Sequence, residues 1–163
     1  MRNISNEQFN KKYYQYKDIL YKISYTYVHN VYDADDIVQD VFMKYLNSNE
    51  SFKTDDNEKY WLIRVTINTC KNFISSNWKK RITFDEDLNK ISNNDLGNVA
   101  EDKCNYNKLF DIIKVLPHKY KEVIILHYIE EMKVNEISSV LKISVSAVKK
   151  RLERARNMIK ERY

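Results

Sequence analysis

The sequence predicts an all-helical fold, and three of its features lead to this expectation. The 163-residue chain contains one glycine and one proline, whereas tight hairpins and phosphate-binding loops depend on glycine. Apolar residues recur at spacings of three and four along several segments, which is the period of an amphipathic helix. One polar, aperiodic stretch, residues 82–102, divides the chain. We therefore expect two small, independent helical domains, residues 1–81 and 103–163, joined by a flexible acidic linker.

The first expected helix begins after Ser5. Ser5 and Gln8 have the spacing of a capping box, in which each side chain accepts a hydrogen bond from the other residue's backbone N–H. An apolar stripe follows at helical spacing, made of Phe9, Tyr13, Tyr16, Leu20, Ile23 and Tyr27. We interpret these aromatic side chains as core residues, because one continuous stripe is typical of a buried helix face.

The second expected helix begins at Asp33, a good N-cap residue, and ends near Asn47. Its apolar stripe consists of Ala34, Ile37, Val38, Val41 and Tyr45, and the opposite face carries Asp36, Gln39, Asp40 and Met43. A polar loop then leads to a third helix over residues 59–80, capped by Asp55 or Asp56. We expect its core positions to be Trp61, Leu62, Val65, Thr69 and either Asn72 or Phe73.

Charge is distributed unevenly along the chain. Residues 1–81 carry 13 basic and 10 acidic side chains, residues 82–102 carry one and six, and residues 103–163 carry 14 and seven. A basic C-terminal third indicates a polyanionic partner, although a solvated helical surface has the same composition.

The C-terminal third shows a helix-turn-helix pattern over residues 133–153. A helix over 106–116 ends at Pro117, and another runs from His118 to about Glu131 with Tyr120, Val123, Ile124 and Tyr128 in its core stripe. Short helices over 134–141 and 145–162 follow, separated by three residues that include Lys142.

The last helix has one apolar and one basic face. Ser144 caps it, and Val148, Leu152, Ala155 and Ile159 form the apolar stripe. Ser146, Lys149, Lys150, Glu153 and Arg154 lie on the outward face, flanked by Arg151 and Arg156. This arrangement is typical of a recognition helix, which docks on its apolar side and enters the major groove with its cations. A solvated basic surface is the alternative.

These motifs resemble the extracytoplasmic-function subgroup of the sigma-70 family of bacterial RNA polymerase sigma factors. Residues 116–123, 134–137 and 148–156 are similar to region 4 of that family, residues 33–42 to region 2.2, and residues 61–69 to the helix that meets the −10 promoter element. The departures are Lys142, where the family often has glycine, Ala147 in place of a frequent threonine, and the acidic Glu153. These three departures affect which −35 sequence we expect the protein to recognise, and leave the expected mode of DNA binding unchanged.

The resemblance implies a promoter-specificity factor that binds core RNA polymerase and promoter DNA, with an anti-sigma factor as a further partner. It implies polymerase binding by Asp33, Asp36, Gln39, Asp40 and Met43. It places −10 binding at Tyr60, Trp61, Arg64, Asn68 and Lys71, with loop 47–57 receiving a flipped base, and −35 binding at Ser146, Lys149, Lys150, Arg151, Glu153, Arg154 and Arg156. Trp61 is equally a candidate core residue, and Tyr60 fits either role.

Other functional classes find little support in the sequence. His29, His118 and His127 share no metal-ligand spacing with Cys70 or Cys104, and no nucleophile elbow is present. We therefore expect no catalytic site, metal, cofactor or small-molecule substrate, and a cytoplasmic location. Two alternatives remain: a stand-alone helix-turn-helix regulator that binds duplex DNA without polymerase, and a helical adaptor that binds only protein. The acidic second helix argues against the first, and the basic cluster argues against the second.

Overall fold

The computed structural model describes residues 2–83, 108 and 111–162, with side chains of the third helix described up to residue 77. The expected linker and the start of the helix expected over 106–116 lie outside the described residues. Regular structure in the described part is helical throughout, as predicted. The helices are α1 (Asn6–Val28), α2 (Val31–Asn47), α3 (Asp55–Thr83), a short helix over 111–115, α5 (His118–Ile124), the π-helical turn η2 (Ile125–Ile129), α6 (Val134–Leu141) and α7 (Val145–Arg162).

Helix α1 begins as the sequence predicts. The Ser5 hydroxyl accepts a hydrogen bond from the backbone N–H of Gln8, and the Gln8 side chain accepts one from the Ser5 N–H, each at 3.2 Å. These bonds satisfy two donors that the first helical turn leaves without partners. The predicted stripe is confirmed: its four C-terminal members are buried, and Phe9 and Tyr13 pack against the core.

Helix α2 begins two residues earlier than predicted, because its N-cap is Asn30 and not Asp33. The Asn30 side chain accepts a hydrogen bond from the Asp33 backbone N–H at 3.0 Å, so Asp33 lies in the first turn. A carboxylate there interacts favourably with the positive end of the helix dipole. The five predicted stripe residues are all buried.

The predicted core positions of helix α3 are confirmed in part: Leu62 and Thr69 are buried, and the buried face is wider than the predicted stripe. Its buried side chains are Glu58, Leu62, Ile63, Thr66, Ile67, Thr69 and Cys70. Trp61, Val65 and Phe73 are half-buried and pack against the core, whereas Asn72 is exposed. The helix is covered by α1 and α2 on one side and by α6 on another, so its apolar face is too wide for a single narrow stripe. Its cap also differs: Thr54, not Asp55 or Asp56, accepts the hydrogen bond from the Asn57 N–H.

Helix α5 changes to π-helical geometry at η2. The Glu130 N–H donates to the carbonyl of Ile125, five residues back. This wider turn changes which side chains face the core, so Ile125 and Leu126 are buried while Tyr128, predicted as a core residue, is 52% exposed. The helix-turn-helix follows as predicted, with Lys142 in the left-handed conformation (φ 55°, ψ 44°). The Ser144 hydroxyl accepts from the Ala147 N–H at 3.1 Å and caps α7.

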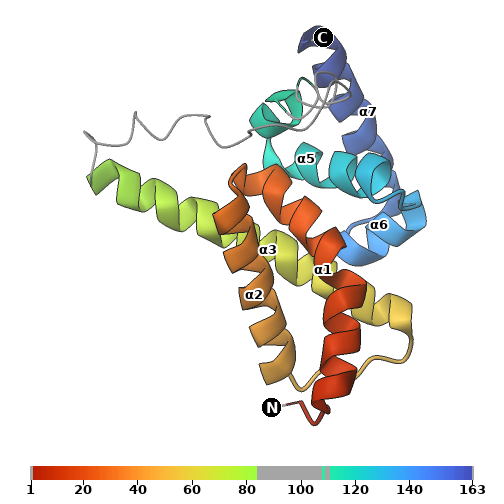
Figure 1. Cartoon of the computed structure of the whole chain (residues 1–163). Coiled ribbons are helices and arrows are strands. Elements are labelled where there is room, and N and C mark those ends of the chain that lie inside the picture. Colours follow the sequence, from red (N-terminus) through yellow and green to blue (C-terminus); the bar gives the residue numbers. More distant parts are fainter. Residues whose placement is uncertain (1, 84–107, 109–110, 163) are drawn as a thin grey trace.

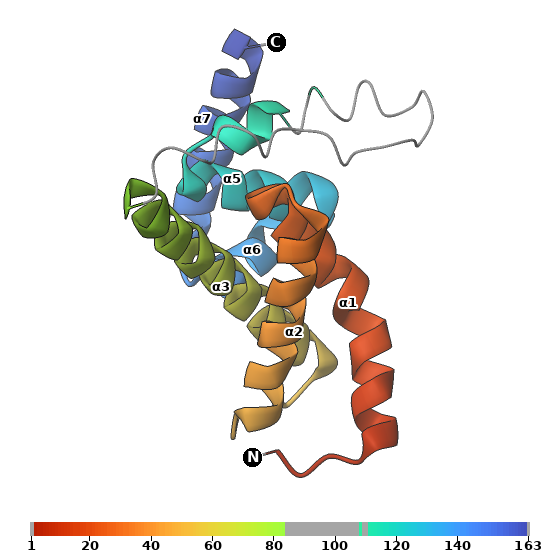
Figure 2. The same ribbon diagram turned by 60° about the vertical axis from the view of Figure 1, so that its left-hand side comes forward.

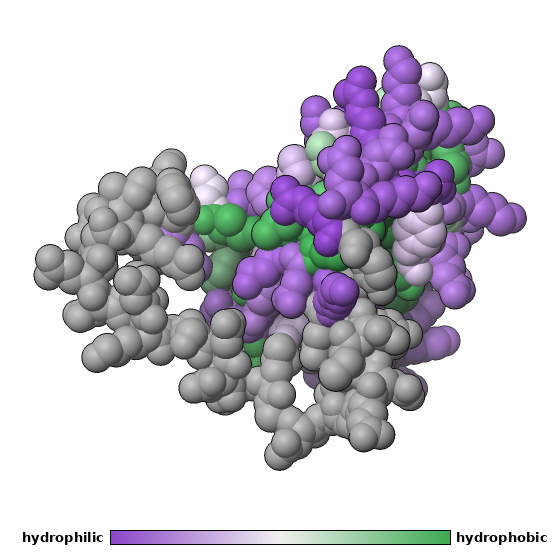
Figure 3. All heavy atoms as spheres, turned by 90° about the horizontal axis from the view of Figure 1, so that it is seen from above, coloured by the Kyte–Doolittle hydropathy of each residue, from purple (hydrophilic) through white to green (hydrophobic). Residues whose placement is uncertain are grey.

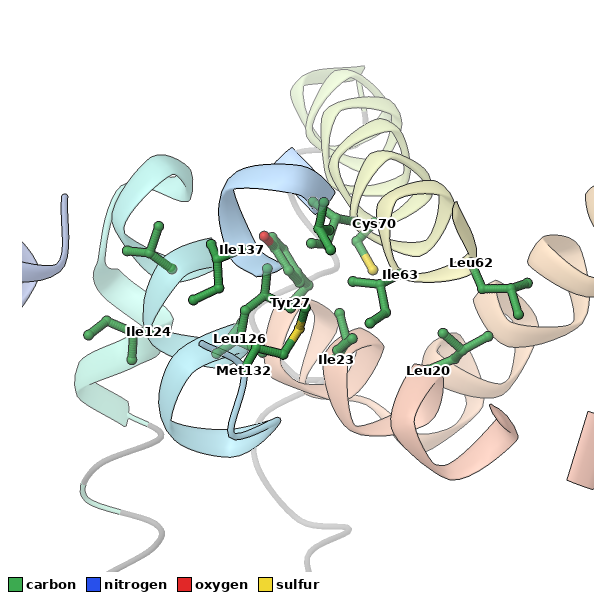
Figure 4. Close-up of a cluster of buried hydrophobic side chains, with 14 of the residues drawn as sticks. Leu20, Ile23, Tyr27, Leu62, Ile63, Cys70, Ile124, Leu126, Met132 and Ile137 are labelled. Carbon is green, nitrogen blue, oxygen red and sulfur yellow. The ribbon is translucent and has the colours of Figure 1, made fainter. Parts of the chain in front are cut away.

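The N-terminal and C-terminal halves share one hydrophobic core, which the sequence did not indicate. Helices α1, α2 and α3 form a bundle, and α5, α6 and α7 lie beside it (Figures 1 and 2). Tyr27 and Cys70 from the first half meet Leu126, Met132 and Ile137 from the second (Figure 4). We call this contact between the halves the closed arrangement. Burial of such side chains contributes about 1.5–3 kcal/mol each.

Candidate nucleic-acid and polymerase interfaces

The outward face of α2 is free of the core. Asp36, Gln39, Asp40 and Met43 are exposed, and Met43 keeps 56% of its surface accessible. Asp40 forms an ion pair with Lys44, one helical turn away, at 3.2 Å. Asp33 is half-buried. The face therefore presents acidic groups around an exposed, adaptable methionine, a composition suited to a basic protein surface.

The polar face of α3 is partly covered by the C-terminal half. Lys71, expected to meet DNA, forms an ion pair with Glu122 of α5, a carboxylate that is 95% buried at its side chain. Tyr60 lies beside Glu136 of α6, and burial together with this carboxylate raises the pKa of Tyr60. Arg64, one turn beyond Tyr60, is half-buried. Two carboxylates of the C-terminal half thus lie against the face expected to bind the DNA strand.

Trp61 and Asn68 occupy different surroundings on α3. The Trp61 ring packs against Tyr45 and Phe52, with centroids 6.3 and 5.8 Å away, which fits the core interpretation of this residue. Asn68 is exposed. The expected contacts of Trp61 and Asn68 with promoter DNA remain predictions.

The outward face of α7 is left exposed by the part of the chain that the structure describes. Ser146, Lys149, Lys150, Glu153 and Arg154 are exposed, and Arg151 is half-buried. The apolar stripe on the other side is confirmed, since Val148, Leu152 and Ala155 are buried and Ile159 packs against the core. Viewed from the C-terminal end of α7, hydrophilic side chains cover most of the described surface (Figure 3).

Two of the α7 arginines are held by tyrosines of α5 and η2, Tyr120 and Tyr128. Arg156 donates through Nε to the Tyr128 hydroxyl at 2.5 Å, and its guanidinium lies 5.7 Å from the centre of that ring. Arg154 hydrogen-bonds to Tyr120 and lowers the pKa of that phenol. A planar guanidinium fixed in this way is pre-organised for a phosphate or a base edge.

Titratable groups meet where the two halves join. The His118 ring stacks on Tyr27 at 5.8 Å, and Nζ of Lys121 lies 5.2 Å from the same ring. Burial lowers the pKa of Lys121, while burial raises the pKa of Cys70 to about 12, so this thiol stays protonated. Burial, with Lys114 and Lys121 nearby, lowers the pKa of His29 to about 4. We expect this contact to respond to pH, because groups of the C-terminal half contribute to the lowered pKa of His29 in the N-terminal half.

The sequence analysis did not predict that Arg2 contacts the loop after α2. Its guanidinium lies over Tyr45 and Phe52 and bonds to the loop that follows α2. A pocket of about 450 Å³ opens beside it, lined by Arg2, Phe52, Lys53, Thr54, Asp55 and Glu58. Arg2 and the loop are more than 40 residues apart in sequence, so no local signal marks them as neighbours.

Among the described residues, no cluster of His, Cys, Asp and Glu side chains is arranged to hold a metal ion, and no helix is long and apolar enough to cross a membrane.

Comparison with known protein families identifies both halves. Residues 13–80 match the family described as Sigma-70 region 2, and residues 106–159 match Sigma-70, region 4. A stand-alone helix-turn-helix regulator has no need of a region 2, so that alternative is not favoured.

Curated relatives match over most of the chain. The RNA polymerase sigma factor SigV of Bacillus subtilis is 30% identical over 145 residues, which cover 89% of this chain and 84% of the relative. SigW of the same organism, an ECF RNA polymerase sigma factor, is 30% identical over 159 residues, covering 90% and 83%. The ECF sigma-E factor of Escherichia coli K12 is 27% identical over 137 residues, covering 78% and 72%.

Solved structures share the fold. The sigma factor RpoE of Bartonella quintana, in complex with the anti-sigma factor NepR, matches with a TM-score of 0.68 at 21% identity, covering 94% of this chain and 95% of that one. CnrH in complex with the cytosolic domain of CnrY matches with a TM-score of 0.69 at 22% identity, covering 96% and 88%. With regions 2 and 4 in order and relatives aligned over nine-tenths of its length, the chain belongs to the extracytoplasmic-function subgroup of the sigma-70 family, the promoter-specificity factors of RNA polymerase.

Proposed function

We propose that three surfaces of this chain divide the work of promoter recognition. The outward face of α2 binds core RNA polymerase, loop 47–57 and the polar face of α3 bind the separated −10 strand, and α7 reads the −35 element in duplex DNA. The domain limits are residues 1–81 and 103–163, with 82–102 as linker. The protein acts in the cytoplasm, where polymerase works, and contributes binding and no catalysis.

The observation that carries this proposal is the opposite character of two exposed faces on one chain. Helix α2 presents Asp36, Gln39, Asp40 and Met43, while α7 presents Lys149, Lys150 and Arg154. The cations of α7 suit the phosphates and base edges of DNA. The carboxylates of α2 would be repelled by DNA, so their partner is a protein with basic groups.

The −10 element requires a different kind of surface. Bases of a separated strand bind to aromatic platforms and to polar groups that replace their lost hydrogen bonds. Loop 47–57 and the beginning of α3 supply Phe52, Tyr60, Arg64 and Asn68, which support binding of single-stranded DNA at this site.

An anti-sigma factor is part of the proposal. The sigma factor RpoE of Bartonella quintana, which shares this fold, was solved in complex with the anti-sigma factor NepR. For this chain, such a partner would bind where it stabilises the closed arrangement or covers α2.

The polymerase surface is tested by charge reversal. Asp36→Lys combined with Asp40→Lys should weaken binding to purified core RNA polymerase by at least tenfold, because each reversed charge replaces attraction with repulsion. The matched control is Asp18→Lys with Glu161→Lys, which makes the same charge change at exposed positions on α1 and α7. Equal affinity of both double variants in a pull-down at moderate salt would contradict the assignment of α2.

A further inference from the structure

Arg2 is tied to the loop after α2 by an unusual number of contacts for a residue so far away in sequence. Its backbone N–H donates to the Leu46 carbonyl at 2.7 Å. Its Nε donates to the Tyr45 carbonyl at 3.2 Å, and its Nη2 donates to the Ser48 hydroxyl at 3.1 Å and to the Glu50 carbonyl at 2.7 Å. The Ser48 hydroxyl also accepts from the Glu50 N–H at 3.2 Å. Arg2 therefore holds both the end of α2 and the first residues of the loop.

The same guanidinium lies against two aromatic rings. Its central carbon is 4.4 Å from the centre of Tyr45 and 5.1 Å from the centre of Phe52. Cation–π contacts of this kind contribute most where water is partly excluded, and Arg2 is half-buried. The cation thus sets the position of the Phe52 ring relative to the end of α2.

Phe52 forms one wall of the pocket beside Arg2. Its other neighbour is Trp61 of α3, at 5.8 Å. Glu58 also lines the pocket, and its carboxylate is fixed by the Tyr45 hydroxyl at 2.6 Å and by Nζ of Lys12 at 2.8 Å. An aromatic ring beside the hydroxyl of Thr54 and the carboxylate of Asp55 has the character of a site for an unstacked nucleobase.

We propose that Arg2 is a positioning residue that determines base specificity at the −10 element, because it holds residues 48–52 and the Phe52 ring in the conformation that accepts an unpaired base. This inference rests on the proposed role of loop 47–57. A lysine at this position is an incomplete substitute, since an ammonium group does not reproduce the planar fork that bonds three oxygens and lies over two rings.

The test uses holoenzyme assembled from purified core RNA polymerase and a promoter library randomised over the −10 element, with a constant −35 element. Each library member carries a barcode in its transcribed region, so that sequencing of the transcripts gives the base preference at each −10 position. Arg2→Gln should reduce the preference at one −10 position by roughly five- to tenfold, and Arg2→Lys by less. Affinity for core enzyme should equal that of the parent. The control is Lys11→Gln, which removes a neighbouring exposed cation of α1.

A second variant, Phe52→Ala, distinguishes the proposed role of Arg2 from the proposed role of loop 47–57 in binding a −10 base. If Phe52→Ala reduces the preference and Arg2→Gln does not, the role of Arg2 is wrong and the role of the loop stands. If neither variant changes any −10 preference, the proposed role of the loop is wrong as well. If Arg2→Gln lowers transcription from all library members equally, Arg2 only stabilises the fold and the inference is overturned.

Discussion

Helices α3 and α7, the two helices proposed to meet DNA, differ in how much of their polar face the folded protein leaves free. On α7, Lys149, Lys150 and Arg154 are all exposed. On α3, Lys71 is paired with Glu122 and Tyr60 lies beside Glu136. If both helices bind DNA as proposed, duplex recognition by α7 needs no rearrangement of the described residues, whereas capture of a single strand by α3 requires the two halves to separate. In the closed arrangement, glutamates occupy the face where phosphates would otherwise approach.

The largest effect is expected from breaking the ion pair that joins the halves. Glu122→Lys replaces attraction to Lys71 with repulsion at a buried position, which should favour separation by about 1–3 kcal/mol, allowing for the partial exposure of Lys71. Small-angle X-ray scattering should show a larger radius of gyration. Fluorescence anisotropy should show tighter binding of single-stranded DNA, because the face of α3 becomes accessible.

The control for this variant is Glu153→Lys, which makes the same charge change at an exposed position on α7. It should leave the radius of gyration unchanged. The double exchange, Lys71→Glu with Glu122→Lys, should restore the closed dimensions. A Glu122→Lys protein with parental dimensions and parental affinity for single strands would show that α3 is already accessible.

A second test addresses the free face of α7. Lys149→Ala and Arg154→Ala should each reduce −35 selection by holoenzyme by about 1–3 kcal/mol if a bidentate or charged base contact is lost. Since the described residues leave the outward face of α7 exposed, the loss should be the same with or without Glu122→Lys. Transcription from a library randomised over the −35 element measures it, with Lys160→Ala near the end of α7 as the control. Loss of selection only in the Glu122→Lys background would mean that α7 also needs opening.

The sequence predicted the elements whose burial is decided locally. The stripes of α1, α2 and α7 each follow one continuous side of their helix, so helical spacing alone identified Leu20, Val41 and Leu152 as core. The turn between α6 and α7 was likewise placed correctly, because the apolar residues of both helices surround it.

The errors in core and contact residues occur where distant segments meet or where a helix is irregular. Ile63, Ile67 and Cys70 of α3 were not predicted as core, because α6 covers a side of the helix that its own sequence does not identify. Tyr128 was placed in the core because a regular α-helix was assumed, and η2 is not regular. The partners of Lys71 and Arg2 depend on contacts between residues about 50 positions apart along the chain, and a periodic pattern does not contain this information.

Acidification offers a smaller, reversible way to separate the halves. His29 lies near Lys114, Lys121 and Asp111, and its pKa is lowered to about 4 by burial and by the two lysines. A group whose pKa is lowered in the closed form stabilises that form above its ordinary pKa of about 6.5. This stabilisation is lost as the pH falls from about 6.5 to 4, because the separated form then binds the additional proton.

The radius of gyration should therefore rise over this pH range, and His29→Asn should reduce the change. Asparagine tolerates the left-handed backbone conformation of this residue (φ 54°). Glu130 contributes with the opposite sign, since burial raises its pKa and its protonation on acidification favours the closed form. An identical pH profile of the parent and of His29→Asn would exclude His29 as the group responsible.

The smallest effect concerns the turn that sets α7 relative to α6. Lys142 adopts φ 55°, ψ 44°, a conformation in which a Cβ atom clashes with the backbone. Lys142→Gly removes that clash but increases the freedom of the unfolded chain, so the net gain should be about 0.5 kcal/mol, or roughly 1–2 °C in Tm. Lys160→Gly is the matched control, because Lys160 lies within the last turns of α7 and glycine in a helix should cost up to about 1 kcal/mol instead. Neither the −35 preference nor the affinity for single strands should change, since Lys142 is not part of the outward face of α7. A change in −35 preference with Lys142→Gly would mean that this lysine itself contacts the promoter, and that the DNA-binding surface extends from α7 into the turn.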